Sequence, residues 1–278
     1  MLKTYFFIPA TRKKFIDKMP FIDADEFVFD LEDAIAENDS ESAFENLQNI
    51  ENRDQYIVRP RLYTSSGKLM NNKLEKLIDM GFHRFFIPKT DTPAMLDDLL
   101  NVFNYYEIDN LEWYYLIESP AALMNIKEMA LSGKYPLKGI CLGSQDYAAE
   151  MGMSYSLETI SWARHYVLNV AKACKIEAID MASMVLKDRK LFETECHQSF
   201  RMGYDSKLVV HPAQLEVLHD LDYYSKEEIE QAQYINEKVN LSELKNFSVI
   251  TVDGLLYERP HINRVKKILN YIKKHENK

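Results

Sequence analysis

Short apolar runs rich in β-branched and aromatic residues alternate along most of the chain with longer stretches whose apolar residues have helical spacing. The short runs predict eight strands: Thr4–Ile8, Glu26–Phe29, Tyr56–Val58, Arg84–Ile87, Trp113–Ile117, Gly139–Leu142, Ile176–Ile179 and Lys207–Val210. The longer stretches predict helices that include Asn71–Met80, Pro93–Phe103, Ala121–Leu131, Leu157–Cys174 and Lys187–Met202. The sequence therefore predicts a regular alternation of strand and helix.

The spacing of these strands indicates how they are connected. From the second strand onward, successive strands lie about 30 residues apart, which is the length of one βα unit. Parallel strands need crossovers of this kind, and continuous apolar runs suit strands that are covered on both faces. No glycine-rich loop follows the first strand, which counts against an open dinucleotide-binding sheet. We therefore predict a (β/α)8 TIM barrel over residues 1–222, with a doubly wound open sheet as the alternative.

The last part of the chain, residues 223–278, is longer than one closing helix requires. Ser225 and Glu228 form a capping-box pattern at the start of an amphipathic stretch, and Asp253-Gly254 is a signal for a two-residue hairpin turn. These patterns predict a helix–hairpin–helix extension, made of Ser225–Val239, the strands Phe247–Val252 and Leu255–Tyr257, and a basic helix His261–Lys274. An isolated hairpin is only marginally stable in water, so we expect this one to pack against other protein.

Composition narrows the class of partner. A formal net charge of −9 opposes binding to nucleic acid or to an anionic membrane surface, and no apolar run approaches the ~18 residues that span a bilayer. The three cysteines, Cys141, Cys174 and Cys196, lie in apolar or helix-like contexts without a CxxC pair, so we expect three buried thiols. These features predict a cytoplasmic protein whose partner is a small molecule.

Polar residues gather where the predicted strands end. Barrel enzymes build their active sites at the C-terminal ends of the strands, so these side chains should converge on one mouth. Any one of them could instead be a solvated loop residue or a helix N-cap. The residues concerned are Asp30, Glu32, Asp33, Arg59, Lys89, Glu118, Asp146 and His211.

Glu118 and Asp146 are the predicted metal ligands. Glu118 directly follows a strand, and Asp146 follows the next strand after Gly143, which allows a tight turn. Hard carboxylate oxygens without a His or Cys cluster favour Mg²⁺, which completes its coordination with water and substrate oxygens. Arg59 could bind the carboxylate of a 2-oxo acid with two hydrogen bonds. The alternative is a structural network of ion pairs in the barrel mouth.

Together these residues carry a family resemblance over nearly the whole chain. The chain resembles the citrate lyase β-subunit-like branch of the HpcH/HpaI aldolase family. The resemblance lies in an ordered series of segments: Phe7–Arg12, Phe29–Ala34, Val58-Arg59, Ile87–Lys89, Leu116–Glu118, Gly143–Asp146, His211–Gln214 and Gly254–Pro260.

The resemblance implies a barrel that binds Mg²⁺ through Glu118 and Asp146 and the oxo acid through Arg59. It implies cleavage or formation of a 3-hydroxyacyl thioester, such as citryl, malyl or citramalyl, with a 2-oxo acid and an acyl thioester on the other side of the reaction. It also implies a homotrimer or hexamer. The positions that would touch the thioester carrier, either CoA or acyl carrier protein, are Phe7, Arg12 and Lys18.

Further residues are expected to support the chemistry. Asp30, Glu32 and Asp33 could orient water around the metal, or they could cap a helix after the second strand, Asp33 above all. The resemblance implies that Glu258 acts as acid or base in the site of a neighbouring subunit. The chain departs from the family at Pro60-Arg61 and Gln145, which leaves the substrate open. Two other interpretations remain: an aldolase that acts on free 2-oxo acids, and a non-catalytic barrel that only binds ligand.

Overall fold

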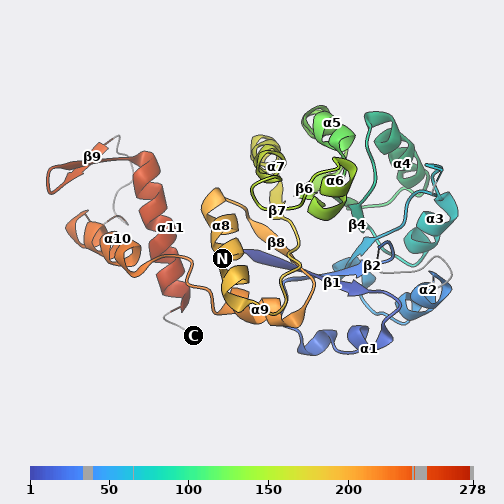
Figure 1. Ribbon diagram of the computed structural model, residues 1–278, viewed down its shortest axis with the longest axis horizontal. Coiled ribbons are helices and arrows are strands. Elements are labelled where there is room, and N and C mark those ends of the chain that lie inside the picture. The colour runs from blue at the N-terminus through green and yellow to red at the C-terminus, as the bar shows by residue number, and fades with distance from the viewer. Residues whose placement is uncertain (34–39, 65, 240, 242–248, 276–278) are drawn as a thin grey trace. The chain divides into compact units, whose positions relative to one another are not determined.

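The computed structural model describes residues 1–33, 40–64, 66–239, 241 and 249–275 (Figure 1). Its contacts divide the chain into two compact units, one made of Leu2–His219 and the other of Asp220–Lys278 with Met1. The division thus falls between residues 219 and 220, whereas the sequence prediction places it after residue 222. The two units are described separately.

The first unit is a closed barrel of eight parallel strands in the order β1 to β8, with β8 paired to β1. The predicted barrel is confirmed, and the open sheet is excluded. The strands are β1 Lys3–Pro9, β2 Glu26–Asp30, β3 Ile57–Arg59, β4 Arg84–Ile87, β5 Glu112–Ile117, β6 Leu137–Leu142, β7 Glu177–Asp180 and β8 Ser206–Val209. Each predicted strand overlaps an observed one: β4 has the predicted bounds, and the ends of the other strands lie within two residues of the predicted ones.

Helices surround the barrel on its outside (Figure 1). Two of them begin at the N-caps Thr92 and Ser119, whose side chains accept hydrogen bonds from backbone N–H groups of the first turn, and each has proline next in the chain. The helices of this unit are α1 Lys13–Ile16, η1 Met19–Phe21, α2 Ser40–Gln48, η3 Arg53–Gln55, α3 Asn71–Asp79, α4 Pro93–Tyr105, α5 Pro120–Leu131, α6 Ser144–Glu150, α7 Ser161–Cys174, α8 Arg189–Met202 and α9 Pro212–His219. All five helices named from the sequence are present.

The barrel interior is filled by apolar side chains, so it forms a packed core rather than a pore. Three aromatic residues of this core, Tyr5, Phe86 and Tyr114, have ring centroids 5.3–5.8 Å apart. Aliphatic residues, including Leu116 and Leu208, complete the core. This packing holds the strand ends in fixed positions, and the polar residues that follow them are therefore fixed as well.

A second, charged cluster joins the barrel to its helix layer. Asp180 on β7 accepts two hydrogen bonds from Arg164 of α7, at 2.8 and 2.9 Å, and one from Lys207 of β8 at 3.0 Å. All three side chains are almost completely buried. The predicted end of the seventh strand at Ile179 was wrong, because this buried ion cluster keeps Asp180 within the ladder.

The second unit contains helix α10 Lys226–Val239, the hairpin strands β9 Val249–Val252 and β10 Leu255–Glu258, and helix α11 Arg259–His275. The predicted capping box is confirmed, since Ser225 and Glu228 exchange hydrogen bonds of 2.9 and 3.2 Å. The hairpin turn is also confirmed: Asp253 and Gly254 both have positive φ. Apolar residues of α10 and α11 form a separate core, which includes Ile235, Ile262 and Ile268.

The cysteine prediction is only partly correct. Cys141 and Cys196 are buried free thiols, and burial raises the pKa of both. Cys174 is half-buried, because it is the last residue of α7 and the helix ends beside solvent. Within the described residues, no helix combines the length and apolar character that crossing a bilayer would need.

Candidate active site

A cavity of about 310 Å³ opens at the C-terminal ends of the barrel strands. Most of the polar residues that the sequence placed at the strand ends line it, which include Asp30, Asp33, Arg59, Glu118 and Asp146. The convergence follows from parallel topology, since every strand of the barrel presents its C-terminal end at the same mouth. His211 does not take part in this convergence, because it lines a different cavity.

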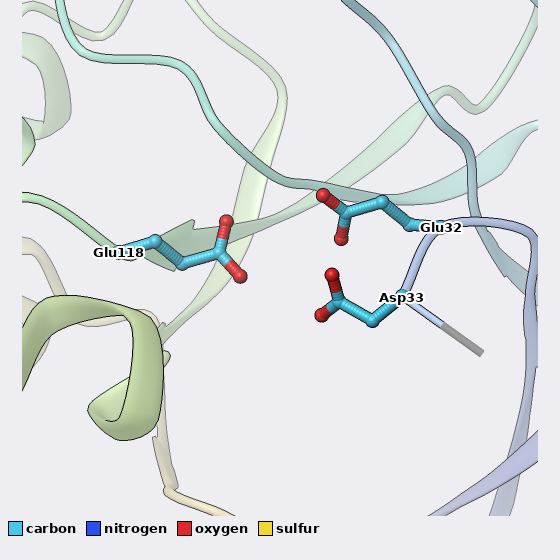
Figure 2. Close-up of side chains that lie close together, drawn as sticks. All are labelled: Glu32, Asp33 and Glu118. Carbon is cyan, nitrogen blue, oxygen red and sulfur yellow. The ribbon is translucent and has the colours of Figure 1, made fainter. Parts of the chain in front are cut away.

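Three carboxylates meet beside this cavity, and two of them, Asp33 and Glu118, line it. Figure 2 shows Glu32, Asp33 and Glu118 with their carboxylate groups turned toward one another. Each offers one oxygen, and these oxygens lie within 4.8 Å of one another. Glu118 extends from the end of β5, while Glu32 and Asp33 stand in the loop after β2. Such a group of hard oxygens can hold a divalent cation.

Two buried oxygens of this cluster lack hydrogen-bond donors. Among the described residues, no donor reaches Glu118 Oε1 or Glu32 Oε2, although Arg59 Nη1 lies 4.0 and 3.3 Å from them. Both side chains are buried, and Glu118 is only 3% exposed. A buried carboxylate oxygen without a partner is costly. The unmatched oxygens therefore have the character of cation ligands.

The proton affinities of the two glutamates are raised for the same reason. Burial, followed by the nearby Glu118 charge, raises the pKa of Glu32 to about 8. Burial also raises the pKa of Glu118 to about 7, against the opposing effects of Lys89 and Arg59. Two acidic groups that share a dry site cannot both ionise easily without a positive charge between them. A divalent cation would supply that charge.

Arg59 is already engaged by carboxylates. It lies opposite Asp30 in the β2–β3 ladder, and its Nε and Nη2 donate to the two Asp30 oxygens at 2.8 and 2.7 Å. Nη1 donates to Asp33 at 3.0 Å. The edge of Arg59 that was expected to bind a substrate carboxylate with two hydrogen bonds is paired with Asp30 in this structure. Only the Nη1 side faces the carboxylate cluster.

Asp146 has a different partner from the one expected. It lines the cavity, but its carboxylate accepts a 2.5 Å hydrogen bond from the Lys89 ammonium, and it does not belong to the three-carboxylate cluster. The Lys89 ammonium also lies 3.6 Å from Glu118 Oε2. A lysine cation thus stands between the two predicted metal ligands. The sequence marked Lys89 only as a strand-end charge and did not suggest this contact.

Gly143 allows Glu118 to reach its position. A Cβ atom at residue 143 would lie 2.4 Å from Glu118 Cγ, which is far too close for a real contact. The Gly143 N–H also donates to the Ile117 carbonyl at 2.7 Å, which joins the ends of β5 and β6. The glycine was predicted for a tight turn, but its φ of −78° is ordinary. Its role is therefore to leave room for the glutamate.

A larger, mainly apolar cavity of about 550 Å³ lies beside the first. It is lined by side chains from β1, α1 and η1 and the residues after β8, which include Phe15, Lys18 and Phe21. Phe7 lines both cavities, and the Arg59 guanidinium carbon lies 5.3 Å from its ring centroid. Arg12 is exposed and is not among the residues that line these two cavities.

Two other residues that the sequence analysis named do not line either cavity. Glu258 ends β10 in the second unit, where its backbone N–H donates to His261 Nδ1 at 3.2 Å. Arg61 donates from Nη2 to the Glu32 carbonyl at 2.9 Å, so it supports the loop that carries the carboxylates. The suggestion that Asp33 caps a following helix concerns residues 34–39, which lie outside the described residues.

Comparison with known proteins gives the family. The sequence profile of the family described as HpcH/HpaI aldolase/citrate lyase matches residues 3–212. The chain belongs to this family. It is therefore a carbon–carbon lyase by family, and the match covers all eight barrel strands together with the loops that carry the carboxylates.

Among its relatives is the citrate lyase subunit beta of Leuconostoc mesenteroides subsp. cremoris, 24% identical over an alignment that covers 96% of this chain and 92% of the relative. A (3S)-malyl-CoA thioesterase of Cereibacter sphaeroides is 26% identical over 96% of this chain and 93% of its own. These alignments extend through the second unit as well as the barrel.

Solved structures share the fold. CitE of Mycobacterium tuberculosis, in complex with magnesium, acetoacetate and coenzyme A, aligns with a TM-score of 0.80 and 20% identity over 97% of each chain. The citrate lyase beta subunit of M. tuberculosis, complexed with oxaloacetate and magnesium, aligns with a TM-score of 0.68 and 22% identity over 81% of this chain and 97% of that one.

Proposed function

We propose that this protein is a Mg²⁺-dependent lyase that cleaves or forms a 3-hydroxyacyl thioester, with a 2-oxo acid and an acyl thioester on the other side of the reaction. The observation that carries the proposal is the pair of unmatched buried oxygens on Glu32 and Glu118, which face Asp33 at the mouth of the barrel. Carboxylates without His or Cys nearby favour magnesium over zinc.

Glu118 is the central ligand in this proposal. Glu32 and Asp33 complete the group as the chain stands, and Asp146 would join when its lysine partner moves. Bound to substrate oxygens, Mg²⁺ would stabilise the negative charge that develops on the hydroxyl oxygen before the carbon–carbon bond breaks. Asp30 holds Arg59 with two hydrogen bonds, and the remaining Nη1 of Arg59 would bind one oxygen of the oxo-acid carboxylate.

The two neighbouring cavities match the two halves of such a substrate. The polar cavity would take the hydroxy-acid half beside the carboxylates and Arg59. The apolar cavity would take the acyl and thioester arm of a CoA or acyl-carrier substrate, with Lys18 at its wall available to a phosphate. Phe7 lines both cavities and would lie beside the thioester carbon. Arg12 would meet the carrier only at the exposed surface.

The departing carbon needs a proton when the bond breaks, because the electron pair of that bond enters the thioester enolate. We propose Glu258 of a neighbouring subunit as the donor, which requires a homotrimer or a hexamer built from trimers. In that arrangement the second unit packs on the neighbour. Exposed apolar residues on the hairpin, such as Leu255 and Leu256, support a role in packing.

The named relatives support the choice of substrate class. One relative is named as a subunit of citrate lyase, and another is named as a thioesterase of malyl-CoA, which is a hydroxyacyl thioester. The M. tuberculosis structures hold magnesium together with acetoacetate and coenzyme A or with oxaloacetate. These ligands have the chemistry that the two cavities would accommodate.

The test is a product assay with citryl-, malyl- and citramalyl-CoA, in which 2-oxo acid and CoA thiol are measured separately. We expect oxo acid to form with Mg²⁺ and to be lost with EDTA or in Glu118→Gln, while the exposed control Glu216→Gln keeps activity. Thiol without oxo acid would indicate thioester hydrolysis instead. Turnover of free hydroxy acids alone would favour a carrier-free aldolase, and calorimetric binding of oxaloacetate or CoA without turnover would favour a ligand-binding barrel.

Mixing two inactive variants tests the role of Glu258. Glu118→Gln removes the metal ligand from one subunit, and Glu258→Gln removes the acid that would act in another subunit. If the residues act across an interface, exchanged mixtures recover some intact sites and therefore some activity. A fully exchanged mixture without recovery, or a monomer in solution, would contradict the assignment.

A further inference from the structure

Lys89 holds an unusual position beside the carboxylate cluster. It follows β4 with a φ of 51°, a left-handed conformation that costs a residue with a side chain on the order of 1 kcal/mol. In this conformation its backbone N–H donates to Glu118 Oε2 at 2.9 Å. Its ammonium group reaches Asp146 Oδ1 at 2.5 Å and lies 3.6 Å from Glu118 Oε2. One residue therefore contacts both carboxylates, and contacts Glu118 through two different groups.

The ammonium is the part of these contacts that solvent reaches. The Lys89 side chain is 37% exposed and that of Asp146 is 41% exposed, while Glu118 is buried. The backbone contact fixes the loop whether or not the side chain stays in place. The lysine end can therefore leave the carboxylates toward solvent without disturbing the position of Glu118.

A divalent cation would compete with this ammonium. Magnesium binds carboxylate oxygens at about 2.0–2.1 Å, closer than an ammonium hydrogen bond. A magnesium ion held by the unmatched Glu118 Oε1 and by Asp146 would lie beside the ammonium, which contacts Glu118 Oε2 and Asp146 Oδ1. Two positive charges at such short range repel each other strongly. The ammonium and the metal ion therefore compete for the same two carboxylates.

We propose that the Lys89 ammonium is an exchangeable internal counter-ion of the metal site: it bridges Asp146 and Glu118 in the metal-free protein and is released when a divalent cation binds. The inference rests on the cation site of the proposed function. Lys89 is then a positioning residue that keeps the carboxylates together before the metal arrives and weakens metal affinity. Release of the Lys89 ammonium would also free Asp146, which lies outside the three-carboxylate cluster, to act as a metal ligand.

Metal affinity is the first measurement. Mn²⁺ replaces Mg²⁺ as the probe, and titration calorimetry is carried out on the full-length protein. Lys89→Met keeps the backbone N–H and removes the competing charge, so we expect Mn²⁺ to bind about tenfold more tightly or better. The matched control is Lys138→Met, which removes a lysine at the opposite end of the barrel beside Glu112 and should leave affinity unchanged. Unchanged or weaker binding by Lys89→Met would overturn the proposal.

Amine labelling of the wild-type protein tests directly whether the Lys89 ammonium is released. It thereby distinguishes release from a purely electrostatic effect of the substitution on metal affinity. Brief reductive methylation with isotopic formaldehyde, read by peptide mass spectrometry, should label Lys89 several-fold faster at saturating Mg²⁺ than in EDTA, while Lys138 labels at the same rate in both. Equal or slower labelling of Lys89 would overturn the release, whatever the affinity of the variant. If the wild-type protein binds no Mn²⁺, the proposed cation site fails and this inference fails with it.

Discussion

Replacement of Glu32 by glutamine should stabilise the metal-free protein at alkaline pH. The glutamine has nearly the shape of the glutamate but carries no charge, so it removes the repulsion between Glu32 and Glu118. Burial and that repulsion raise the pKa of Glu32 from 4.5 to about 8, and burial, with a smaller contribution from Asp146, raises that of Glu118 from 4.5 to about 7. The folded protein therefore keeps protons that the unfolded chain loses.

The sign of the pH dependence follows from this difference. Between about pH 5 and pH 8 the folded state binds more protons than the unfolded state, so the free energy of unfolding falls as the pH rises. The substitution removes the titration of Glu32, whose pKa rises from 4.5 to about 8, so an assay between pH 5.5 and pH 8 covers about 2.5 pH units of this range. At ~1.4 kcal/mol for each pKa unit, this amounts to about 3 kcal/mol. For a domain of this size that is about 6–12 °C in Tm.

The assay is thermal unfolding of the metal-free protein in EDTA at pH 5.5 and pH 8. The wild-type protein should lose stability relative to Glu32→Gln as the pH rises, and the control Glu216→Gln, an exposed carboxylate of α9, should follow the wild type. Added Mg²⁺ should restore the wild type at pH 8 and stabilise Glu32→Gln much less. If the Tm of the wild type and that of Glu32→Gln changed equally with pH, the reasoning would be refuted. In that case folding would not make the Glu32–Glu118 pair keep a proton that the unfolded chain loses.

Three further substitutions test other parts of the molecule. Gly143→Ala places a Cβ 2.4 Å from Glu118 Cγ, so it should weaken Mn²⁺ binding at least about tenfold by calorimetry, with an unchanged circular dichroism spectrum. Arg164→Met leaves the buried Asp180 short of two hydrogen bonds, and urea denaturation should give a loss of about 3–5 kcal/mol; a loss below about 1 kcal/mol would count against this. Arg59→Lys cannot span both Asp30 oxygens, so steady-state kinetics should give a raised KM for the oxo acid with metal affinity largely kept.

The sequence alone determined the barrel and the end at which its site lies. The period of about 30 residues between apolar runs fixes parallel strands with helical crossovers, and parallel strands present all their C-terminal ends at one mouth. Asp30, Arg59 and Glu118 could be placed there because each directly follows or closes a strand. The capping box and hairpin turn were equally readable, since both depend on residues that are neighbours in the chain.

Only the tertiary structure decided which charges meet. Asp30 and Arg59 pair because the β2–β3 register sets them opposite each other, and register is not visible in the sequence. The loop after β2 returns Glu32 and Asp33 to Glu118. Lys89, which follows β4 with a left-handed backbone conformation, reaches Asp146, which follows β6. These contacts depend on side-chain direction and loop path, to which distant parts of the chain contribute. The residue types were therefore predictable, and their partners were not.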